Sequence, residues 1–521
     1  MDWFRSPDFR DRALHLMKTH HLPGLCVAVV QDGQTASLAL GHASLDPPVE
    51  CTPDTLFDIA SCSKSFTGVA VALLVQDEEH HPRVRWDTPV NEILLEFVLP
   101  DADSTRSVTL DDIVSHRTGM PRAERPDTPQ TVTQSLRHLP PVAPLRTKHL
   151  YNHIMFTVAA HLVAQHTGAP FSRFLNERIF GPLGMRSTSL QPSGARASGL
   201  ADRIATGYRW DRRARSYRGT PAPECHEGEG AGSIVTTAGD LLRWVEALMR
   251  REGPVITRAV YAEVVRQRSM CNPRSRGLRP WTSPAYYGAG VEVYYYRGRA
   301  VVTHSGGIDG FGSRFALLPE EGFGVVVCGN AEGAAAVSGA LTRELVDEFL
   351  GVPKEQRSYR AKLEKKSRHK MGERASPDDD GEDGNEDGDE DDGHGPSDES
   401  DSDSESAAGD EEETVALEEH ELQRYTGRYH HPGYHGMTVQ IRDGKLFIDG
   451  RDRSFACTIE LEARPRGGTD FRATLRDEMG LLEEWLAADF VVDDGAREAV
   501  RMGLRLEPQL KQLIWFERVE S

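Results

Sequence analysis

The chain of 521 residues is predicted to contain an α+β domain built on an antiparallel sheet. Apolar runs of strand length at residues 25–30 and 36–40 flank an Asp32-Gly33 turn, a pattern typical of a β-hairpin. Further strand patterns lie between residues 291 and 328, and capped helix patterns fill the region between the two groups. Strands at both ends of a segment, with helices between them, indicate that the first and last strands share one sheet.

The first half of this domain is predicted to be mostly helical around the hairpin. One helix ends near His20, and a second begins at Ser61. Thr109 caps a short amphipathic helix, and a longer helix opens at Tyr151 and stops at Gly168. The second helix carries an apolar stripe that would bury it, made of Phe66, Val69, Ala70, Leu73 and Leu74.

The second half returns from helices to strands. Residues 172–179 form one expected helix, and Thr236 or Thr237 caps another that runs through Trp244. A last helix is expected at residues 334–350. The expected strands before it are residues 291–295, 300–303, 313–318 and 324–328.

The acidic residues are concentrated in one stretch, although the formal net charge of the whole chain is −20. Between Asp378 and Glu413 there are 20 Asp or Glu and no Lys or Arg, so removing them from 81 leaves 61 acidic against 61 basic residues. This neutral remainder argues against nucleic-acid binding and against attraction to a membrane. Residues 376–413, rich in Asp, Glu, Ser and Gly, are predicted to be a disordered linker, and the basic residues 354–370 before it are expected to be helical.

A small β domain is predicted after the linker. An Asp443-Gly444 turn lies among four strand patterns of alternating apolar residues. These patterns are residues 425–429, 437–441, 445–448 and 513–516. We therefore expect an α+β domain at 1–352, a linker at 353–417 and a β domain at 418–521.

The sequence predicts a cytoplasmic protein without a metal or an organic cofactor. Residues 1–10 hold no apolar run of signal-peptide length, and no later run is long enough to span a bilayer. Seven scattered cysteines without a Cys-x-x-Cys pair favour free thiols in a reducing compartment. Three pairs of adjacent histidines lack a carboxylate or cysteine at ligand spacing and are expected to lie at the surface, at residues 20–21, 80–81 and 430–431.

The strongest chemical signal is Ser61-Cys62-Ser63-Lys64 at the start of the second predicted helix. Residues three apart on a helix lie on one face, about 5–6 Å apart at their Cβ atoms. A serine nucleophile needs a neighbour that accepts its proton, and a lysine can do so when burial or another cation lowers its pKa. Ser61 and Lys64 therefore suit a nucleophile and its activator. An N-cap serine with a solvated lysine is the structural alternative.

Three patches of the chain, in order, resemble the signature motifs of the serine β-lactamase-like family. Ser61-Cys62-Ser63-Lys64 resembles Ser-x-x-Lys, Tyr151-Asn152-His153 resembles Tyr-x-Asn, and His304-Ser305-Gly306-Gly307 resembles the His-x-Gly variant of Lys-Thr-Gly. The resemblance covers roughly residues 10–350, and the part from Glu418 is similar to a small lipocalin-like barrel. Phrases similar to the class C-type branch, which includes esterases and D-amino-acid peptidases, are residues 115–120, 179–185 and 231–234.

The resemblance implies a β-lactamase/transpeptidase-like fold and a role for each matching residue. Ser61 would be the nucleophile that forms an acyl-enzyme, and Lys64 and Tyr151 would share the proton relay. The backbone N–H groups of Ser61 and Gly307 would form the oxyanion hole. His304 would lie on the innermost strand, beside the Lys64–Tyr151 pair.

Two histidines depart from the family pattern. His153 replaces the amide that would hold the substrate carbonyl and Lys64, and one imidazole nitrogen can donate or accept but not both. His304 replaces a lysine and removes the permanent cation that would bind the carboxylate of a β-lactam. Both changes move the prediction toward esters or small amides. His304 also predicts a titration near neutrality, with activity falling below about pH 6.

Each candidate residue could instead have a purely structural role. Tyr151 could be a core tyrosine, and His153 and His304 could be hydrogen-bonded structural residues. Cys62 would point about 100° away from Ser61 on a helix and is expected to be buried packing. Gly288-Ala289-Gly290 lacks the third glycine and the βαβ setting of a nucleotide-binding loop.

The sequence therefore predicts a serine hydrolase that acts through an acyl-enzyme on carboxylic esters or small amides. Acyl transfer by the same fold and a non-catalytic binding or scaffold role stay open as alternatives. The β domain at 418–521 holds no second Ser-x-x-Lys and is expected to shape substrate access. A homo-oligomer formed through this domain is left open.

Overall fold

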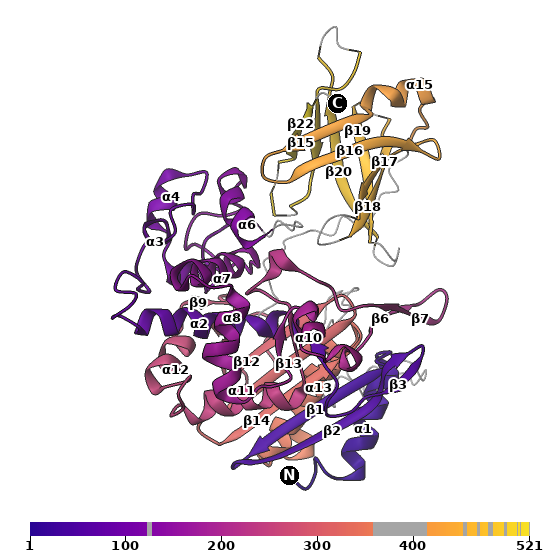
Figure 1. Cartoon of the computed structure of the whole chain (residues 1–521). Coiled ribbons are helices and arrows are strands. Elements are labelled where there is room, and N and C mark those ends of the chain that lie inside the picture. The colour runs from indigo at the N-terminus through magenta and orange to yellow at the C-terminus, as the bar shows by residue number, and fades with distance from the viewer. Residues whose placement is uncertain are drawn as a thin grey trace, which may run out of the picture.

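The computed structural model forms a large α+β body and a smaller barrel (Figure 1). In Figure 1 the barrel, coloured orange to yellow, lies at the end of the molecule where the helix α6 (Pro129–Ser135) is found. In the part of the chain that the structure describes, none of the helices is long and apolar enough to cross a bilayer. The structure describes residues 1–121, 128–357, 414–451, 456–465, 469–477, 483–493, 497–507, 509–510 and 512–519.

A nine-stranded antiparallel sheet forms the centre of the large body, in the order β3-β2-β1-β14-β13-β12-β11-β10-β9. β1 pairs with β14 from Leu25↔Gly329 to Gln31↔Phe323, so the prediction that the first and last strands share one sheet is confirmed. Its strands are β1 Gly24–Gln31, β2 Gln34–Leu45, β3 Pro48–Glu50, β9 Ser269–Met270, β10 Tyr286–Tyr287, β11 Glu292–Tyr296, β12 Arg299–Ile308, β13 Phe311–Leu318 and β14 Phe323–Gly329.

Helices cover both faces of this sheet, which explains why β1 reads as a continuous apolar run. Leu25, Val27 and Val29 belong to a core shared with α1 (Pro7–Thr19) and α13 (Ala334–Phe349). The alternate residues Cys26, Ala28 and Val30 belong to the second core, with α2 (Lys64–Gln76) and α11 (Ala238–Arg250). Thr237 caps α11 through its side chain, one of the two positions expected.

A helical region lies between α2 and α11 in the chain. Its longest helix, α7, spans Ile154–Thr167 and ends at Gly168 in the left-handed conformation, as expected. The expectation that Tyr151 opens this helix is wrong, because α7 begins only at Ile154, where Asn152 Oδ1 accepts from the Met155 N–H of its first turn. The other elements are α3 Val90–Ile93, α4 Ala102–Ser107, α5 Leu110–Ile113, η2 Leu136–His138, α8 Phe171–Leu175, the π-helical η3 Asn176–Phe180, α9 Gly181–Leu183, α10 Pro192–Ala197, η4 Ala201–Arg203 and η5 His226–Gly228.

Short strands connect the helical region to the sheet. β8 pairs with both β4 and β5, and this small sheet holds the backbone just before Ser61. The bounds of the remaining elements of the large body are β4 Phe57–Asp58, β5 Ser189–Leu190, β6 Gly207–Asp211, β7 Ser216–Thr220, β8 Ile234–Thr236, α12 Arg258–Val265 and η6 Lys354–Gln356.

The carboxy-terminal part is a closed barrel of eight antiparallel strands, which confirms the predicted small β-barrel. Tyr429, Phe471 and Phe490 belong to its buried interior, where the Phe490 ring contacts the other two rings. A short helix, α15 (Glu419–Leu422), precedes the barrel. The strands are β15 Gly427–His431, β16 His435–Arg442, β17 Lys445–Gly450, β18 Cys457–Ala463, β19 Asp470–Asp477, β20 Glu483–Val491, β21 Arg501–Leu504 and β22 Ile514–Val519.

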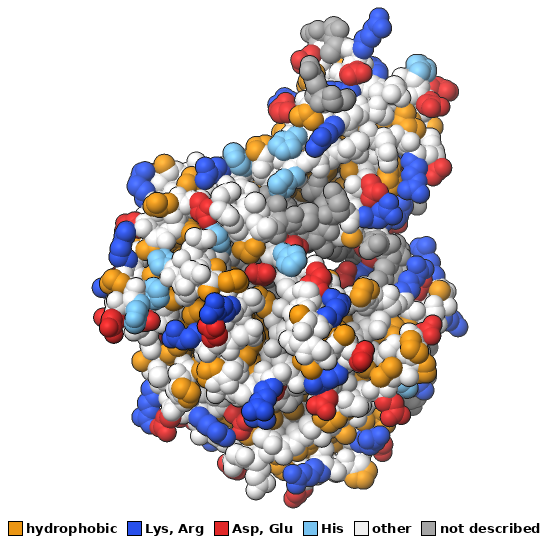
Figure 2. All heavy atoms as spheres, viewed as in Figure 1, with side chains coloured by type: hydrophobic (Ala, Val, Ile, Leu, Met, Phe, Trp, Pro, Cys, Tyr) orange, Lys and Arg blue, Asp and Glu red, His pale blue; other side chains and the backbone are white. Residues whose placement is uncertain are grey.

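The predicted acidic linker at 376–413 lies outside the described residues, as does most of the basic stretch at 354–370. The division into domains at 352 and 417 stays a prediction. Basic and acidic side chains are interspersed over the face seen in Figure 2, in keeping with their near-equal numbers outside the linker.

Contacts between the barrel and the large body can be followed in the part of the chain that the structure describes. Arg209 on β6 forms a buried ion pair with Asp477 at the end of β19, where the side chains are 7% and 3% exposed. Gly433, between β15 and β16, lies against Leu139 and the His138 carbonyl. Arg209 also pairs with Asp309 in the β12–β13 turn, so the barrel and that turn share one cation.

Candidate active site

Ser61 lies in a tight turn immediately before α2. This turn, η1 (Ala60–Ser63), runs directly into α2 at Lys64, so the two side chains lie on one face. Ala60 takes the left-handed conformation, with φ 44°, and its N–H donates to Oδ1 of the buried Asp58. The Lys64 ammonium donates to Ser61 Oγ over 3.0 Å. The structure thus brings together the two residues of the Ser-x-x-Lys motif.

Lys64 is fully buried and held from several sides. Its Nζ donates to the Ala231 carbonyl over 2.8 Å and lies 3.2 Å from His153 Nδ1. Because an ammonium only donates, His153 Nδ1 is the acceptor, and a neutral ring then carries its proton on Nε2. The ammonium also lies 4.9 Å from the centre of the Tyr151 ring, within cation–π distance. Lys64, His153 and Tyr151 therefore form one contiguous group around Ser61.

The edge of β12 completes the group. A Cβ placed on Gly306 would lie 2.1 Å from the Ile59 carbonyl, so only glycine allows this strand to approach the Ser61 turn. Cys62 Sγ donates to the His304 carbonyl over 3.3 Å at the same contact. Gly307, the next residue along, is exposed and has open space above its Cα. A substrate can therefore approach the Gly307 backbone from solvent.

His304 is a neutral, fully engaged side chain. Its Nδ1–H donates to the Ser305 carbonyl over 2.6 Å, and its Nε2 therefore accepts from the Tyr287 hydroxyl over 2.8 Å. Burial, together with the nearby Lys64 cation, lowers the pKa of His304 to about 3. The expectation that His304 titrates near neutrality and limits activity below about pH 6 is wrong, because the buried ring cannot take up a proton there.

Tyr287 is the site residue that the sequence reasoning missed. It is fully buried, and its hydroxyl donates to His304 Nε2. Gly288-Ala289-Gly290 follows it directly in the chain. A Cβ on Gly290 would lie 2.1 Å from the Lys64 carbonyl, so this glycine lets β10–β11 pack on the Ser61 helix. The sequence feature that could have pointed to Tyr287 is its position directly before Gly288-Ala289-Gly290 and the strand β11.

Two further side chains near the nucleophile have perturbed acidity. Burial raises the pKa of the Cys62 thiol to about 12, so it stays protonated, in keeping with the expected packing role. Burial raises the pKa of Asp58 to about 7, against the hydrogen bond from Ala60 N–H, which lowers it. The seven cysteines are free of disulfides.

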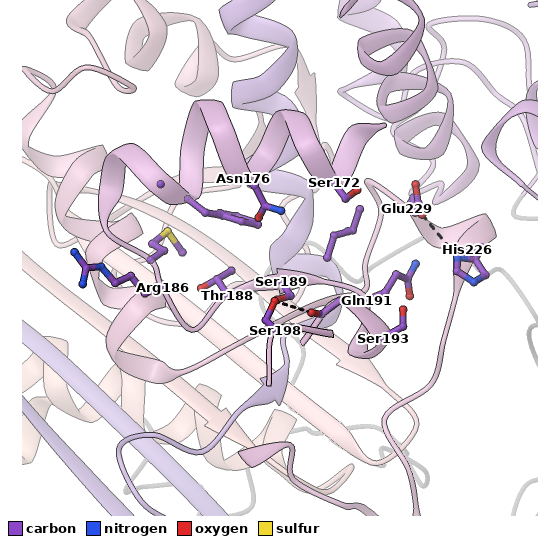
Figure 3. Close-up of a pocket in the computed structure, with 15 residues that line it drawn as sticks. Ser172, Asn176, Arg186, Thr188, Ser189, Gln191, Ser193, Ser198, His226 and Glu229 are labelled. Atoms are coloured by element: carbon purple, nitrogen blue, oxygen red, sulfur yellow. Dashed lines mark hydrogen bonds and ion pairs between the residues drawn. The ribbon is translucent and has the colours of Figure 1, made fainter. Parts of the chain in front are cut away.

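A pocket of about 520 Å³ has a lining that does not include Ser61 (Figure 3). Asn176 and Ser172 line one wall, and His226 and Glu229 line another, as Figure 3 shows. The pocket contains none of the six predicted site residues. Ser61, Lys64, Tyr151, His153, His304 and Gly307 thus gather at a separate place, at the junction of α2, α7 and β12.

No three His, Cys, Asp or Glu side chains of the described ranges are grouped as they would be around a metal ion. The paired histidines at 20–21, 80–81 and 430–431 fall within these ranges.

An antiparallel sheet with helices on both faces, a helical region beside it and a Ser-x-x-Lys turn between them define the β-lactamase/transpeptidase-like class of fold. The model of the β-lactamase family matches residues 9–348, and the chain belongs to that family. A second model, a domain of unknown function (DUF3471), matches residues 411–518. The family assignment therefore covers the large body and leaves the barrel without an assigned role.

Curated relatives of the chain include hydrolases. An unguisins hydrolase of Aspergillus campestris is 36% identical over 361 residues, which cover 67% of this chain and 66% of that protein. A D-aminopeptidase of Brucella anthropi is 28% identical over 346 residues, covering 64% of this chain and 60% of that protein. The chain thus spans about two thirds or less of the length of these relatives.

Solved structures show the same fold. An octameric penicillin-binding protein homologue from Pyrococcus abyssi has a TM-score of 0.58 at 16% identity and covers 98% of this chain and 99% of its own. A class C β-lactamase from Rhodobacter sphaeroides has a TM-score of 0.52 at 23% identity, covering 65% of this chain and 99% of its own. The first of these likenesses extends over the barrel as well as the large body.

Proposed function

We propose that the protein is a serine hydrolase that forms an acyl-enzyme at Ser61 and acts on carboxylic esters or small amides. The observation that carries this proposal is the 3.0 Å hydrogen bond between the buried Lys64 Nζ and Ser61 Oγ. Membership of a family of serine hydrolases supports it. The names of the relatives, a hydrolase and a D-aminopeptidase, support chemistry at a carbonyl centre.

In the acylation step, Ser61 Oγ attacks the carbonyl carbon while its proton passes to the Tyr151 oxygen of the Lys64–Tyr151 pair, which would enter the step as a phenolate because the Lys64 ammonium has no lone pair to accept it. The bond from the carbonyl to the leaving alcohol or amine breaks, and the leaving group takes up that proton. The N–H groups of Ser61 and Gly307 would hold the oxyanion, and one such preorganised donor is worth about 10²–10³ in rate. Water then attacks the ester of Ser61, which restores the serine and releases the acid.

His153 would serve both functions of the amide that the family places there. Its Nδ1 accepts from Lys64 over 3.2 Å, and the neutral ring then has an N–H at Nε2 to donate to a substrate carbonyl. One nitrogen cannot both donate and accept, but the imidazole divides the two functions between its two nitrogens. This arrangement supports a working site rather than a scaffold.

The neutral state of His304 favours uncharged acyl substrates. Its pKa of about 3 and its two occupied nitrogens leave no cation at the position where the family pattern has a lysine. A substrate carboxylate beside the scissile bond would then lack an ionic partner at residue 304. Esters and amides without that carboxylate fit the site better than β-lactams.

The barrel would shape access to the site and contribute to assembly. Its contacts at Arg209 and at Leu139 lie on the sheet side and on the helical side of the large body. The Pyrococcus abyssi homologue, which the chain matches over almost its full length, is octameric, which supports a homo-oligomer here. Seven free thiols support a reducing compartment such as the cytoplasm.

The test compares turnover of a short neutral p-nitrophenyl ester with that of a β-lactam bearing a carboxylate. We expect the wild-type protein to hydrolyse the ester much faster than the β-lactam, and Ser61→Ala to lose both activities. Cys62→Ala is the matched control, since it removes the adjacent buried thiol and should retain turnover. Ester hydrolysis by Ser61→Ala at the wild-type rate would overturn the proposal.

A further inference from the structure

We infer that His116, a residue outside the three motifs, is a positioning residue that fixes Tyr151 for the proton relay. The inference rests on the proposed function, because it assigns His116 to the support of a residue in the proposed relay. His116 lies in the turn after α5 and is fully buried.

His116 binds the backbone on both sides of Tyr151. Its carbonyl accepts from Leu150 N–H over 2.8 Å, and its Nδ1 accepts from Asn152 N–H over 3.0 Å. One residue therefore holds the backbone N–H groups of the two residues on either side of the tyrosine. Since Tyr151 precedes α7, the hydrogen bonds of that helix do not fix its backbone.

The His116 ring also contacts the Tyr151 side chain. The two ring centres are 4.4 Å apart, with an angle of 39° between the ring planes. Tyr287, which supports His304, lies 4.5 Å away on another side of the same ring. His116 thus lies between the tyrosine of the relay and the tyrosine behind β12.

The backbone of His116 is held in an unfavourable conformation to make these contacts. Its φ of 60° lies in the left-handed region, which a non-glycine residue seldom adopts. Strain of this kind persists where the surroundings enforce it, and Asn152 Nδ2 donates to the Met120 and Pro121 carbonyls of the same turn. The turn and the Tyr151 segment are therefore tied together at several points.

The chemistry of the ring suits a geometric role. Burial, with further effects of His149 and Lys64, keeps the pKa of His116 well below its ordinary value, so the ring stays neutral and Nδ1 keeps its lone pair. The proton is then on Nε2, which is buried without a hydrogen-bond partner among the described residues. A buried polar atom left unpaired is a cost, which an apolar residue would avoid if only packing mattered at this position.

The test is the second-order rate constant for labelling of Ser61 by a fluorophosphonate, which does not depend on how much of a sample is folded. His116→Phe keeps a ring and loses the acceptor, and we expect about a tenfold or greater loss of rate. His116→Asn tolerates positive φ and has Oδ1 in the position of Nδ1, so we expect a loss below about threefold. His149→Phe, a matched change 5.3 Å away, should stay within about twofold.

The deciding measurement repeats both His116 variants in the Tyr151→Phe background. If His116 acts through Tyr151, neither variant lowers the rate there by more than about twofold. Equal losses in both backgrounds, or a His149→Phe loss as large as that of His116→Phe, would show a general packing effect and overturn the inference. Wild-type labelling by Tyr151→Phe alone would instead reject the relay of the proposed function, and the inference with it.

Discussion

Replacing Asp58 with asparagine should remove a pH-dependent weakness in the turn that carries Ser61. Asp58 is fully buried, its Oδ1 accepts from Ala60 N–H over 2.7 Å, and its Oδ2 has no hydrogen-bond partner among the described residues. Burial disfavours the ionised carboxylate and raises its pKa from 3.8 to about 7. Asparagine keeps an oxygen for the Ala60 N–H and cannot ionise.

The sign of the effect follows from the raised pKa. The folded chain holds the Asp58 proton between about pH 4 and pH 7, where the unfolded chain has released it, so stability falls as pH rises through that window. With about 1.4 kcal/mol for each pKa unit, the free energy of unfolding of the wild type should fall by about 2–3 kcal/mol relative to Asp58→Asn between pH 5 and pH 8. Above pH 7 the loss is nearly complete.

Urea unfolding of both proteins at pH 5, 6, 7 and 8 measures this difference. Asp54→Asn is the control, because that carboxylate is 82% exposed and its removal should leave the pH dependence of the wild type unchanged. Parallel stability curves for the wild type and Asp58→Asn would refute the reasoning, since they would show that Asp58 is ionised in the folded protein throughout.

Three further predictions concern single side chains. His304→Gln should leave the acidic limb of the pH–activity profile unmoved between pH 5 and pH 8, because the wild-type pKa is about 3; a clear displacement of the limb would contradict this. His153→Asn, which keeps an acceptor for Lys64, should retain kcat within about tenfold, whereas His153→Leu should lose about 10–100-fold; equal kcat values for the two would count against the His153–Lys64 hydrogen bond. Arg209→Ala removes the cation that pairs with the buried Asp477 and should cost about 3–5 kcal/mol in urea unfolding, much of it recovered by adding Asp477→Leu; no recovery in the double variant would show that the ion pair is not the cause.

The sequence predicted those features of the fold that depend on residues close together in the chain. Alternate residues of β1 face two different cores, and that double burial is why the strand reads as one apolar run. Thr237 and Gly168 mark helix ends because a side-chain cap and a left-handed glycine are requirements of the adjacent backbone. The spacing of Ser61 and Lys64 likewise follows from a single helical turn.

Properties that depend on distant residues could not be read in this way. His304 is neutral because Tyr287 and the Ser305 carbonyl occupy its nitrogens within a buried site. Tyr151 lies before α7, rather than on it, because His116 and the turn near Met120 hold that segment.

The contact between the barrel and the large body depends on two residues far apart in the chain, Arg209 and Asp477, and no local sequence pattern predicts it. Such pairings exist only once the chain is folded.

The most direct test of the proposed acyl-enzyme is intact-mass analysis after brief exposure to an activated ester, followed by peptide mapping of the adduct. We predict one acyl group per chain, located on Ser61 and absent from Ser61→Ala, with Cys62→Ala labelled like the wild type. An adduct that persists in Ser61→Ala, or a wild-type protein that turns over the ester without passing through any adduct on Ser61, would contradict the account.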